Sequence, residues 1–183
     1  MKKISFAVAA ALAMCAAGSA SAADGTITFT GRIVESTCSV DIGGGGGTTT
    51  VALRDVNPSA LASNPAVGEV KFAIKLTGGT GTPATCTKDT ANLIIDPVNS
   101  NLTGDGMIAN TATAGTNVAV KLLNEDNGGA VIDLNNPGDS LVRAKSSGEF
   151  TYNLAARYHV PASESAAKAG NFSGKLVFDV ENY

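Results

Sequence analysis

The chain has 183 residues, of which 13 are basic and 16 acidic, giving a formal net charge of −3. A chain of this length can bury the core of one domain but not comfortably of two. No basic stripe occurs, which argues against a nucleic-acid partner, because phosphates require clustered lysine and arginine.

The first 22 residues have the layout of an export signal. Lys2 and Lys3 supply charge, residues 4–17 are almost wholly apolar, and Ala20-Ser21-Ala22 has the small-x-small form that signal peptidase cleaves. The apolar run is short for a membrane-spanning helix, which needs roughly 20 residues. Loss of both lysines with the leader would leave 11 basic against 16 acidic residues, a net charge of −5. We therefore expect residues 1–22 to be removed on export.

Cysteine usage agrees with an oxidising compartment. Cys15 lies in the leader, and Met14 stands where a lipoprotein signal would have a small residue, which argues against a lipid anchor there. Cys38 and Cys86 remain, and an even number in an exported chain predicts a disulfide. Closing the 49-residue loop from Cys38 through Cys86 would stabilise the fold by ~4 kcal/mol in the chain-entropy description.

The segment 25–34 reads as an extended strand with one apolar face. Ile27, Phe29 and Ile33 alternate with polar residues, and Gly31 takes the remaining place on the apolar face. Only three residues then precede Cys38, where a second strand is expected to begin.

The remaining sequence predicts short strands separated by glycine, proline, asparagine and threonine clusters. The expected strands span residues 48–53, 70–76, 92–96, 118–123, 130–134, 150–160 and 172–181. Pro58–Ala62 suits a single helical turn, and Asp126-Asn127-Gly128-Gly129 suits a tight hairpin turn. Alternating strands with one disulfide predict an all-β, immunoglobulin-like sandwich.

The residues that could carry chemistry do not form a recognisable active site. His159 is the only histidine, which excludes a copper or zinc site with several histidines. No Gly-x-Ser-x-Gly motif accompanies it, and it falls on the polar side of its strand. The stretch 133–144 resembles part of a calcium loop, but Pro137 and Ala144 occupy ligand positions. We expect no enzymatic activity, no metal and no cofactor.

Several local patterns resemble those of one protein family. Four stretches occur in the same order as in pilins of the chaperone-usher pathway: Thr26–Val34 followed by Cys38–Asp41, Ser63–Leu76 with Cys86 beyond it, Thr116–Leu123, and Ala156–Tyr158. The resemblance covers almost the whole exported chain and is greatest to the main subunits of type 1 fimbriae.

The resemblance implies an incomplete immunoglobulin-like β-sandwich, which lacks its last strand and is completed by donor-strand exchange. Residues 1–22 would be the signal peptide, 23–34 the N-terminal donor-strand arm, and 35–183 the pilin domain. The arm residues that would fill a neighbour's groove are Ile27, Phe29, Gly31 and Ile33.

The family also implies a role for the C-terminal strand, which would form one edge of the acceptor groove. The residues concerned are Phe172, Leu176, Phe178, Val180 and Tyr183. Strict alternation places Tyr183 on the polar side, whereas these pilins usually have an inward tyrosine one position earlier.

The implied function is that of a structural subunit, expected to be the repeating shaft subunit, of an adhesive fimbria. Its partners would be neighbouring pilin subunits, a periplasmic chaperone, an outer-membrane usher, and tip adhesin or adaptor subunits; its place would be the cell surface, reached through the periplasm. One alternative is a minor or adaptor subunit of the same system. Another is a self-complete secreted sandwich that binds carbohydrate, with residues 25–34 as its own first strand, although the chain lacks tryptophan.

Overall fold

The structure, a computed structural model, describes residues 38–78 and 86–183, all within the compact unit Glu35–Tyr183. Its strands are β1 (Cys38–Ile42), β2 (Val70–Gly78), β3 (Thr90–Ile95), β4 (Ala119–Asn124), β5 (Ala130–Ile132), β6 (Val142–Ala144), β7 (Phe150–His159) and β8 (Phe178–Asn182). The helical elements are α1 (Pro58–Ser63) and two 3-10 turns, η1 (Glu125–Asn127) and η2 (Gly138–Leu141).

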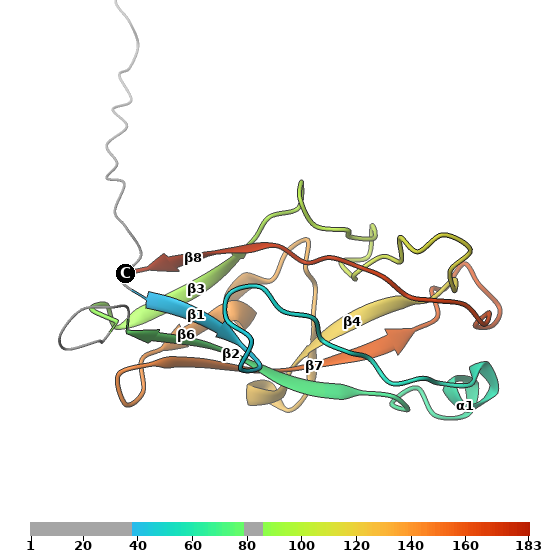
Figure 1. Ribbon diagram of the computed structural model, residues 1–183, viewed down its shortest axis with the longest axis horizontal. Coiled ribbons are helices and arrows are strands. Elements are labelled where there is room, and N and C mark those ends of the chain that lie inside the picture. The colour runs from blue at the N-terminus through green and yellow to red at the C-terminus, as the bar shows by residue number, and fades with distance from the viewer. Residues whose placement is uncertain (1–37, 79–85) are drawn as a thin grey trace, which may run out of the picture. The chain divides into compact units, whose positions relative to one another are not determined.

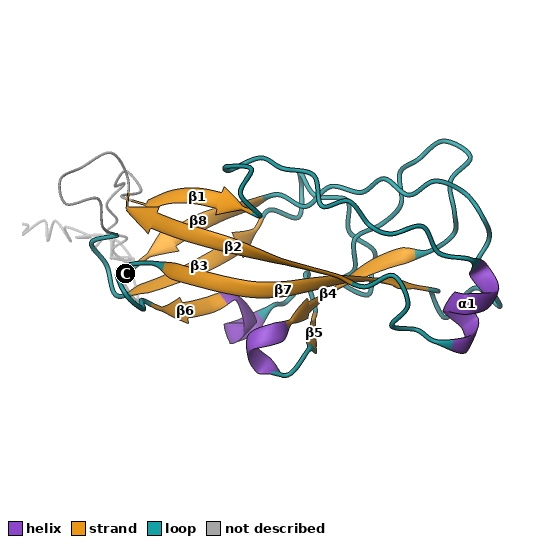
Figure 2. Cartoon of the chain, turned by 60° about the horizontal axis from the view of Figure 1, so that its bottom comes forward, coloured by secondary structure: helices purple, strands orange, loops and turns teal. Residues whose placement is uncertain are grey.

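The strands form two antiparallel sheets that enclose one core (Figure 1). The larger sheet has the order β1-β2-β7-β4-β5, and the smaller has the order β6-β3-β8. Strands of both sheets gather at one end of the unit, and loops with α1 occupy the other end (Figure 2). The expected all-β, immunoglobulin-like sandwich is confirmed at the level of its layers.

The strand β7 lies at the centre of the larger sheet, between β2 and β4, and its alternating side chains direct one face into the core. Phe150, Tyr152 and Leu154 are each at most 1% exposed and turn into the core. The Tyr152 hydroxyl donates a hydrogen bond of 3.0 Å to the carbonyl of Ala91 on β3, which joins the two sheets. Burial raises the pKa of Tyr152, so the phenol stays neutral and keeps its donor.

The connections follow local chemistry. Pro58 opens α1, and the Asn57 side chain caps it by accepting the Ser59 N–H at 3.0 Å. The expected helical turn is thus confirmed. The β4–β5 hairpin is also confirmed, but its turn is longer than the expected tight one, because η1 intervenes and positive φ falls on Gly128 (63°) and Gly129 (78°).

Five expected strands correspond to β2, β3, β4, β5 and β7, whereas β6 was not expected. The prediction of a paired strand at 48–53 is wrong, because this extended segment pairs with no described strand. The expected strand 172–181 forms a ladder only from Phe178 onward. Alternation predicts which side chains turn inward, but it does not reveal which segment forms backbone hydrogen bonds with the strand. No helix among the described residues is long and apolar enough to cross a membrane.

Candidate interaction groove

Each sheet ends in a strand that has a neighbour on one side only. β1 pairs with β2 alone, and β8 pairs with β3 alone. In an antiparallel ladder, successive residues direct their N–H and C=O groups to opposite sides. Half of the backbone groups of β1 and β8 therefore point away from their own sheets.

The segment 171–177, which leads into β8, continues this arrangement without a strand beside it. Its odd-numbered residues bond to the segment 96–116 through their carbonyl groups. The backbone bonds run from Asp96 to Val177 (2.9 Å), Asn101 to Lys175 (2.8 Å), Thr111 to Ser173 (2.7 Å) and Thr116 to Asn171 (3.0 Å), each from N–H to C=O. The carbonyl groups on one side of 171–177 are thus all engaged.

The other side of the same segment is free. The backbone N–H and C=O groups of Phe172, Gly174 and Leu176 have no hydrogen-bonding partner among the described residues. The side chains of Phe172 and Leu176 turn inward: Phe172 lines the groove described below, and Leu176, like Phe178 beyond it, packs against the core cluster. An unpaired strand edge therefore lies directly above half-buried apolar side chains.

The facing wall is the extended segment 47–56 that follows β1. Among the residues that the structure describes, this segment makes no backbone–backbone hydrogen bond. Val51 and Leu53 are half-buried, whereas Ala52 and Arg54 are exposed, so the alternation of a strand is present. In Figure 1 this teal segment and the red segment before β8 run along the same length of the sandwich.

An apolar groove separates the two walls. It consists of hollows of about 240 Å³ and about 550 Å³, which share lining residues of both walls and so form one continuous groove. The shared residues are Thr50, Val51, Leu53, Phe172 and Gly174. The floor of the smaller hollow is apolar and consists of Phe72, Ile74, Ile108, Val120, Leu122, Leu154 and Ala156.

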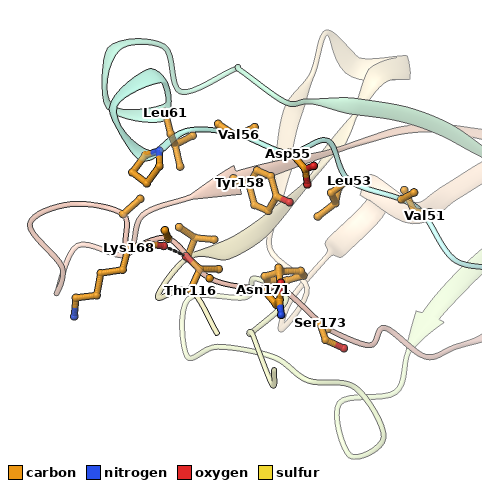
Figure 3. Close-up of a pocket in the computed structure, with 18 of the residues that line it drawn as sticks. Val51, Leu53, Asp55, Val56, Leu61, Thr116, Tyr158, Lys168, Asn171 and Ser173 are labelled. Carbon is orange, nitrogen blue, oxygen red and sulfur yellow. Dashed lines mark hydrogen bonds between the residues drawn. The ribbon is translucent and has the colours of Figure 1, made fainter. Parts of the chain in front are cut away.

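The larger hollow lies at the end near α1 (Figure 3). The Tyr158 ring meets Phe172 edge to face, with centroids 6.0 Å apart. Thr116 donates a hydrogen bond of 2.5 Å to the Lys168 carbonyl, drawn as a dashed line in Figure 3, and so fixes the loop that borders this end. Burial raises the pKa of Tyr158, so this phenol is uncharged at neutral pH.

A glycine permits the close approach of the edge to Ile108 and Ala109. A Cβ at position 174 would lie 2.6 Å from the Ile108 side chain and 2.8 Å from the Ala109 carbonyl. Any larger residue would push 171–177 into the groove or away from its hydrogen bonds. Gly174 is therefore needed for packing, in addition to its place in the apolar alternation.

The disulfide between Cys38 and Cys86 is present, as expected. It joins the start of β1 to the chain that precedes β3. The Asn182 amide lies 3.6 Å from the Cys38 sulfur, so the ends of β1 and β8 come together beside the bridge.

The structure brings most of the C-terminal site residues to the groove side of the core. Phe172 lines the groove, and Leu176, Phe178 and Val180 pack against the core cluster. Tyr183 differs: its backbone exchanges two hydrogen bonds of 3.0 Å with Thr90, and its side chain is 57% exposed. The expected arm residues Ile27, Phe29, Gly31 and Ile33 lie outside the described residues.

Among the described residues, the side chains that the sequence offered for chemistry lie in ordinary surroundings. His159 ends β7 on the outer face, where burial and the Lys121 charge lower its pKa. Among residues 38–78 and 86–183, no three His, Cys, Asp or Glu side chains are grouped so that they could hold a metal ion. Asp133 accepts the Asn135 N–H at 2.9 Å, as in an ordinary turn.

The sequence did not reveal that the segment 47–56 is an unpaired wall. It also did not reveal Ser100, Asn101 and Asn110, which bind 171–177 on the side away from the groove. No motif marks these three polar residues. Only their position beside the C-terminal strand reveals them.

Comparisons with known proteins show the family to which the chain belongs. A family model described as fimbrial protein matches residues 27–182. The F17 fimbrial protein of Escherichia coli is 38% identical over 129 residues, covering 69% of each chain. The major fimbrial subunit SMF-1 of Stenotrophomonas maltophilia is 30% identical over 171 residues, covering 88% of this chain and 94% of that protein.

Among solved structures, the crystal structure of the P pilus rod subunit PapA has the same fold. The TM-score is 0.56 at 17% sequence identity, with 80% of this chain and 99% of that chain covered. The family match spans most of the chain, and the likeness to PapA shows the fold. The chain therefore belongs to the fimbrial protein family, and it is a structural, non-enzymatic subunit of surface fimbriae of the chaperone-usher type.

Proposed function

We propose that this chain is the repeating shaft subunit of its fimbria and polymerises by donating a strand to its neighbour. Residues 1–22 are the export signal, residues 23–34 are the donated arm, and residues 35–183 form the accepting domain. The observation that carries the proposal is the apolar groove between two unpaired backbone edges, 47–56 on one side and 171–177 on the other.

The groove has the chemistry of a strand acceptor. An inserted strand could bond to the free N–H and C=O groups of both walls while its alternate side chains reach the apolar floor. Left empty, the same edges would be a template for unspecific aggregation. A strand from another molecule would pair the free backbone groups and would also cover the exposed edges.

The arm supplies matching side chains. Burial of Ile27, Phe29 and Ile33 would contribute about 1.5–3 kcal/mol each, and ladder hydrogen bonds about 1 kcal/mol apiece. The loss of conformational freedom of the arm opposes these gains. Gly31 lacks a Cβ and would fit where the inserted strand passes closest to the floor.

This mode of contact produces a filament. Each subunit donates at one surface and accepts at another, so the contact is head-to-tail and repeats without closing. Before assembly, a periplasmic chaperone would occupy the groove, and an outer-membrane usher would exchange it for the next subunit's arm. A tip adhesin or adaptor subunit would begin the filament. A role in the shaft is supported by the likeness to a major fimbrial subunit and to a rod subunit.

The proposal is tested by changes in the arm. Phe29→Asp or Gly31→Leu should abolish filaments, because a charge or a side chain would meet the apolar groove of the neighbour. Thr28→Asp is the matched control, because the same charge is placed on the opposite face of the arm and filaments should persist. Electron microscopy of cells, together with subunit levels on immunoblots, measures both effects. Filaments of normal length with Phe29→Asp and with Gly31→Leu would refute the proposed arm.

A further inference from the structure

The edge segment 171–177 is held on the side away from the groove by side chains as well as by backbone N–H groups of the segment 96–116, which forms no regular strand there. The N–H groups of Ser173, Lys175 and Val177 donate to side-chain oxygens of Asn110 (2.9 Å), Asn101 (3.1 Å) and Ser100 (2.8 Å), respectively. We call Ser100, Asn101 and Asn110 the edge clamp. In a regular sheet, these three N–H groups would bond to carbonyls of a neighbouring strand.

Asn110 is the most connected member of the edge clamp. Its amide group donates to the carbonyls of Thr116 (2.7 Å) and Asn171 (2.9 Å), while its oxygen accepts the N–H groups of Ala112 (3.0 Å) and Ser173 (2.9 Å). One side chain thus fixes both the loop 110–116 and the start of the edge segment.

Ser100 and Asn101 hold the other end of the same segment. The Ser100 hydroxyl is buried, accepts the Val177 N–H and donates to the Val177 carbonyl at 3.2 Å. The Asn101 side chain accepts the Lys175 N–H, while the Asn101 backbone N–H donates to the Lys175 carbonyl at 2.8 Å. Both backbone groups of Lys175 and of Val177 are therefore engaged on the side away from the groove.

We propose that the edge clamp positions the acceptor edge by locking its phase, so that even-numbered backbone groups face the groove. A shift by one residue would turn Phe172 and Leu176 out of the groove and would break the bonds that the odd-numbered backbone groups make to the edge clamp. The three side chains are positioning residues, because every bond that they make to the segment 171–177 lies on the side away from the groove. This inference rests on the proposed strand donation and adds the residues that prepare the groove for it.

The test separates accepting from folding. A subunit with a loosened edge but an intact arm can still insert its arm into a filament. Its own groove then accepts the arm of the following subunit more slowly. Asn110→Ala, produced together with the wild-type chain, should therefore shorten wild-type filaments. If about 1.4 kcal/mol of hydrogen bonding is lost, we expect a variant groove to accept an arm about tenfold more slowly. In an equal mixture, half of the grooves are slowed in this way, so filaments should be roughly fivefold shorter.

Two further variants keep the test sharp. Ser100→Ala removes one hydroxyl from a buried position and should also shorten filaments. It replaces Asn110→Ala in the test if that variant accumulates poorly. Asn101→Asp retains the oxygen that accepts the Lys175 N–H and should leave filament length unchanged, whereas Asn101→Ala should shorten filaments. Asn135→Ala is the matched control, because Asn135 also bonds to backbone carbonyls, those of Thr103 and Gly104, away from the edge.

The measurements are filament length in electron micrographs and subunit level on immunoblots of the same cells. Shortening by Asn110→Ala or Ser100→Ala at normal subunit level, without shortening by Asn135→Ala, is the expected result. Unchanged filament length at a normal level of the variant subunit would overturn the inference. Fewer filaments, each of full length, would overturn it as well, since that result indicates a role in folding alone. Failure of the wild-type chain to form filaments would instead overturn the proposed function and, with it, this inference.

Discussion

The two borders of the sandwich differ in how their polar groups are satisfied. At the closed border, formed by Asn124, Asp126, Ser140 and Arg143, the chain bonds to itself. The Arg143 guanidinium donates to Asn124 (2.8 Å), to Asp126 (3.1 Å) and to the Ser140 carbonyl (3.1 Å). The Asp126 carboxylate also accepts the backbone and side-chain N–H groups of Asn153, at 3.0 and 2.7 Å.

At the open border, formed by 47–56 and 171–177, the facing backbone groups remain unpaired. The core beneath is nevertheless well packed, with Leu76, Phe150 and Tyr152 completely buried. The long unpaired edges over an apolar floor therefore lie at the open border and do not reflect a weak fold, whereas the edge strands at the closed border, β5 and β6, have three residues each. This contrast predicts that changes at the open border affect assembly, whereas changes at the closed border affect stability.

The largest effect on assembly is expected from a charge in the groove. Leu176→Asp should abolish filaments, because the inserted strand would have to desolvate a carboxylate. Val131→Asp places the same charge on the exposed outer side of β5 and should leave filaments intact. Micrographs and subunit levels of both variants decide the matter, and filaments of wild-type length with Leu176→Asp would contradict the contrast between the borders.

The largest effect on stability is expected from the disulfide, which anchors β1 at the open border. A Cys38→Ser, Cys86→Ser double variant should lose ~4 kcal/mol of unfolding free energy, since the denatured chain would no longer be closed into a loop. The subunit level in the periplasm should fall accordingly. Normal accumulation of the double variant would show that the bridge is dispensable.

A smaller effect is expected at the closed border. Asp126→Ala should lower the unfolding free energy by about 1 kcal/mol, since a partly exposed carboxylate loses its bonds to Arg143 and Asn153. Filament length should not change, because the closed border does not contact the groove. Urea denaturation and micrographs measure the two readouts, and shortened filaments would show that the borders are coupled.

The smallest effect is a dependence on pH. Burial raises the pKa of Asp126, but hydrogen bonds from Asn153 and Arg143 outweigh it and lower this pKa below its usual value. The unfolded chain then binds the proton more readily, so this contribution is present at neutral pH and fades as the pH falls below about 4. Asp126→Asn should show a shallower loss of stability than the wild type between about pH 5 and pH 3. Identical slopes in urea titrations would contradict this.

The sequence predicted the strands that have neighbours on both sides better than those at the open border. Apolar and polar residues alternate along most of β7 and β2, and the bounds of both strands were predicted within two residues at each end. The strand β6 has only three residues and no clear alternation, and it was not expected. The turn after β4 is longer than its Asn-Gly pair suggested.

The open border could be predicted only in part. Alternation predicted that Phe172, Leu176 and Phe178 turn inward. It could not show that side chains of the segment 100–110 hold 171–177 in place. These contacts join residues more than 60 positions apart and leave no periodic signal. The segment 48–53 has the composition of a strand, yet its partner is absent from the described part of the chain.

The most direct test of the central claim is a high-resolution map of the assembled filament. We predict a strand formed by residues 27–33 of one subunit between 47–56 and 171–178 of the next, bonded to the even-numbered backbone groups of the latter segment. A map in which each groove is filled by its own chain's residues 27–33, or stays empty, would contradict the account.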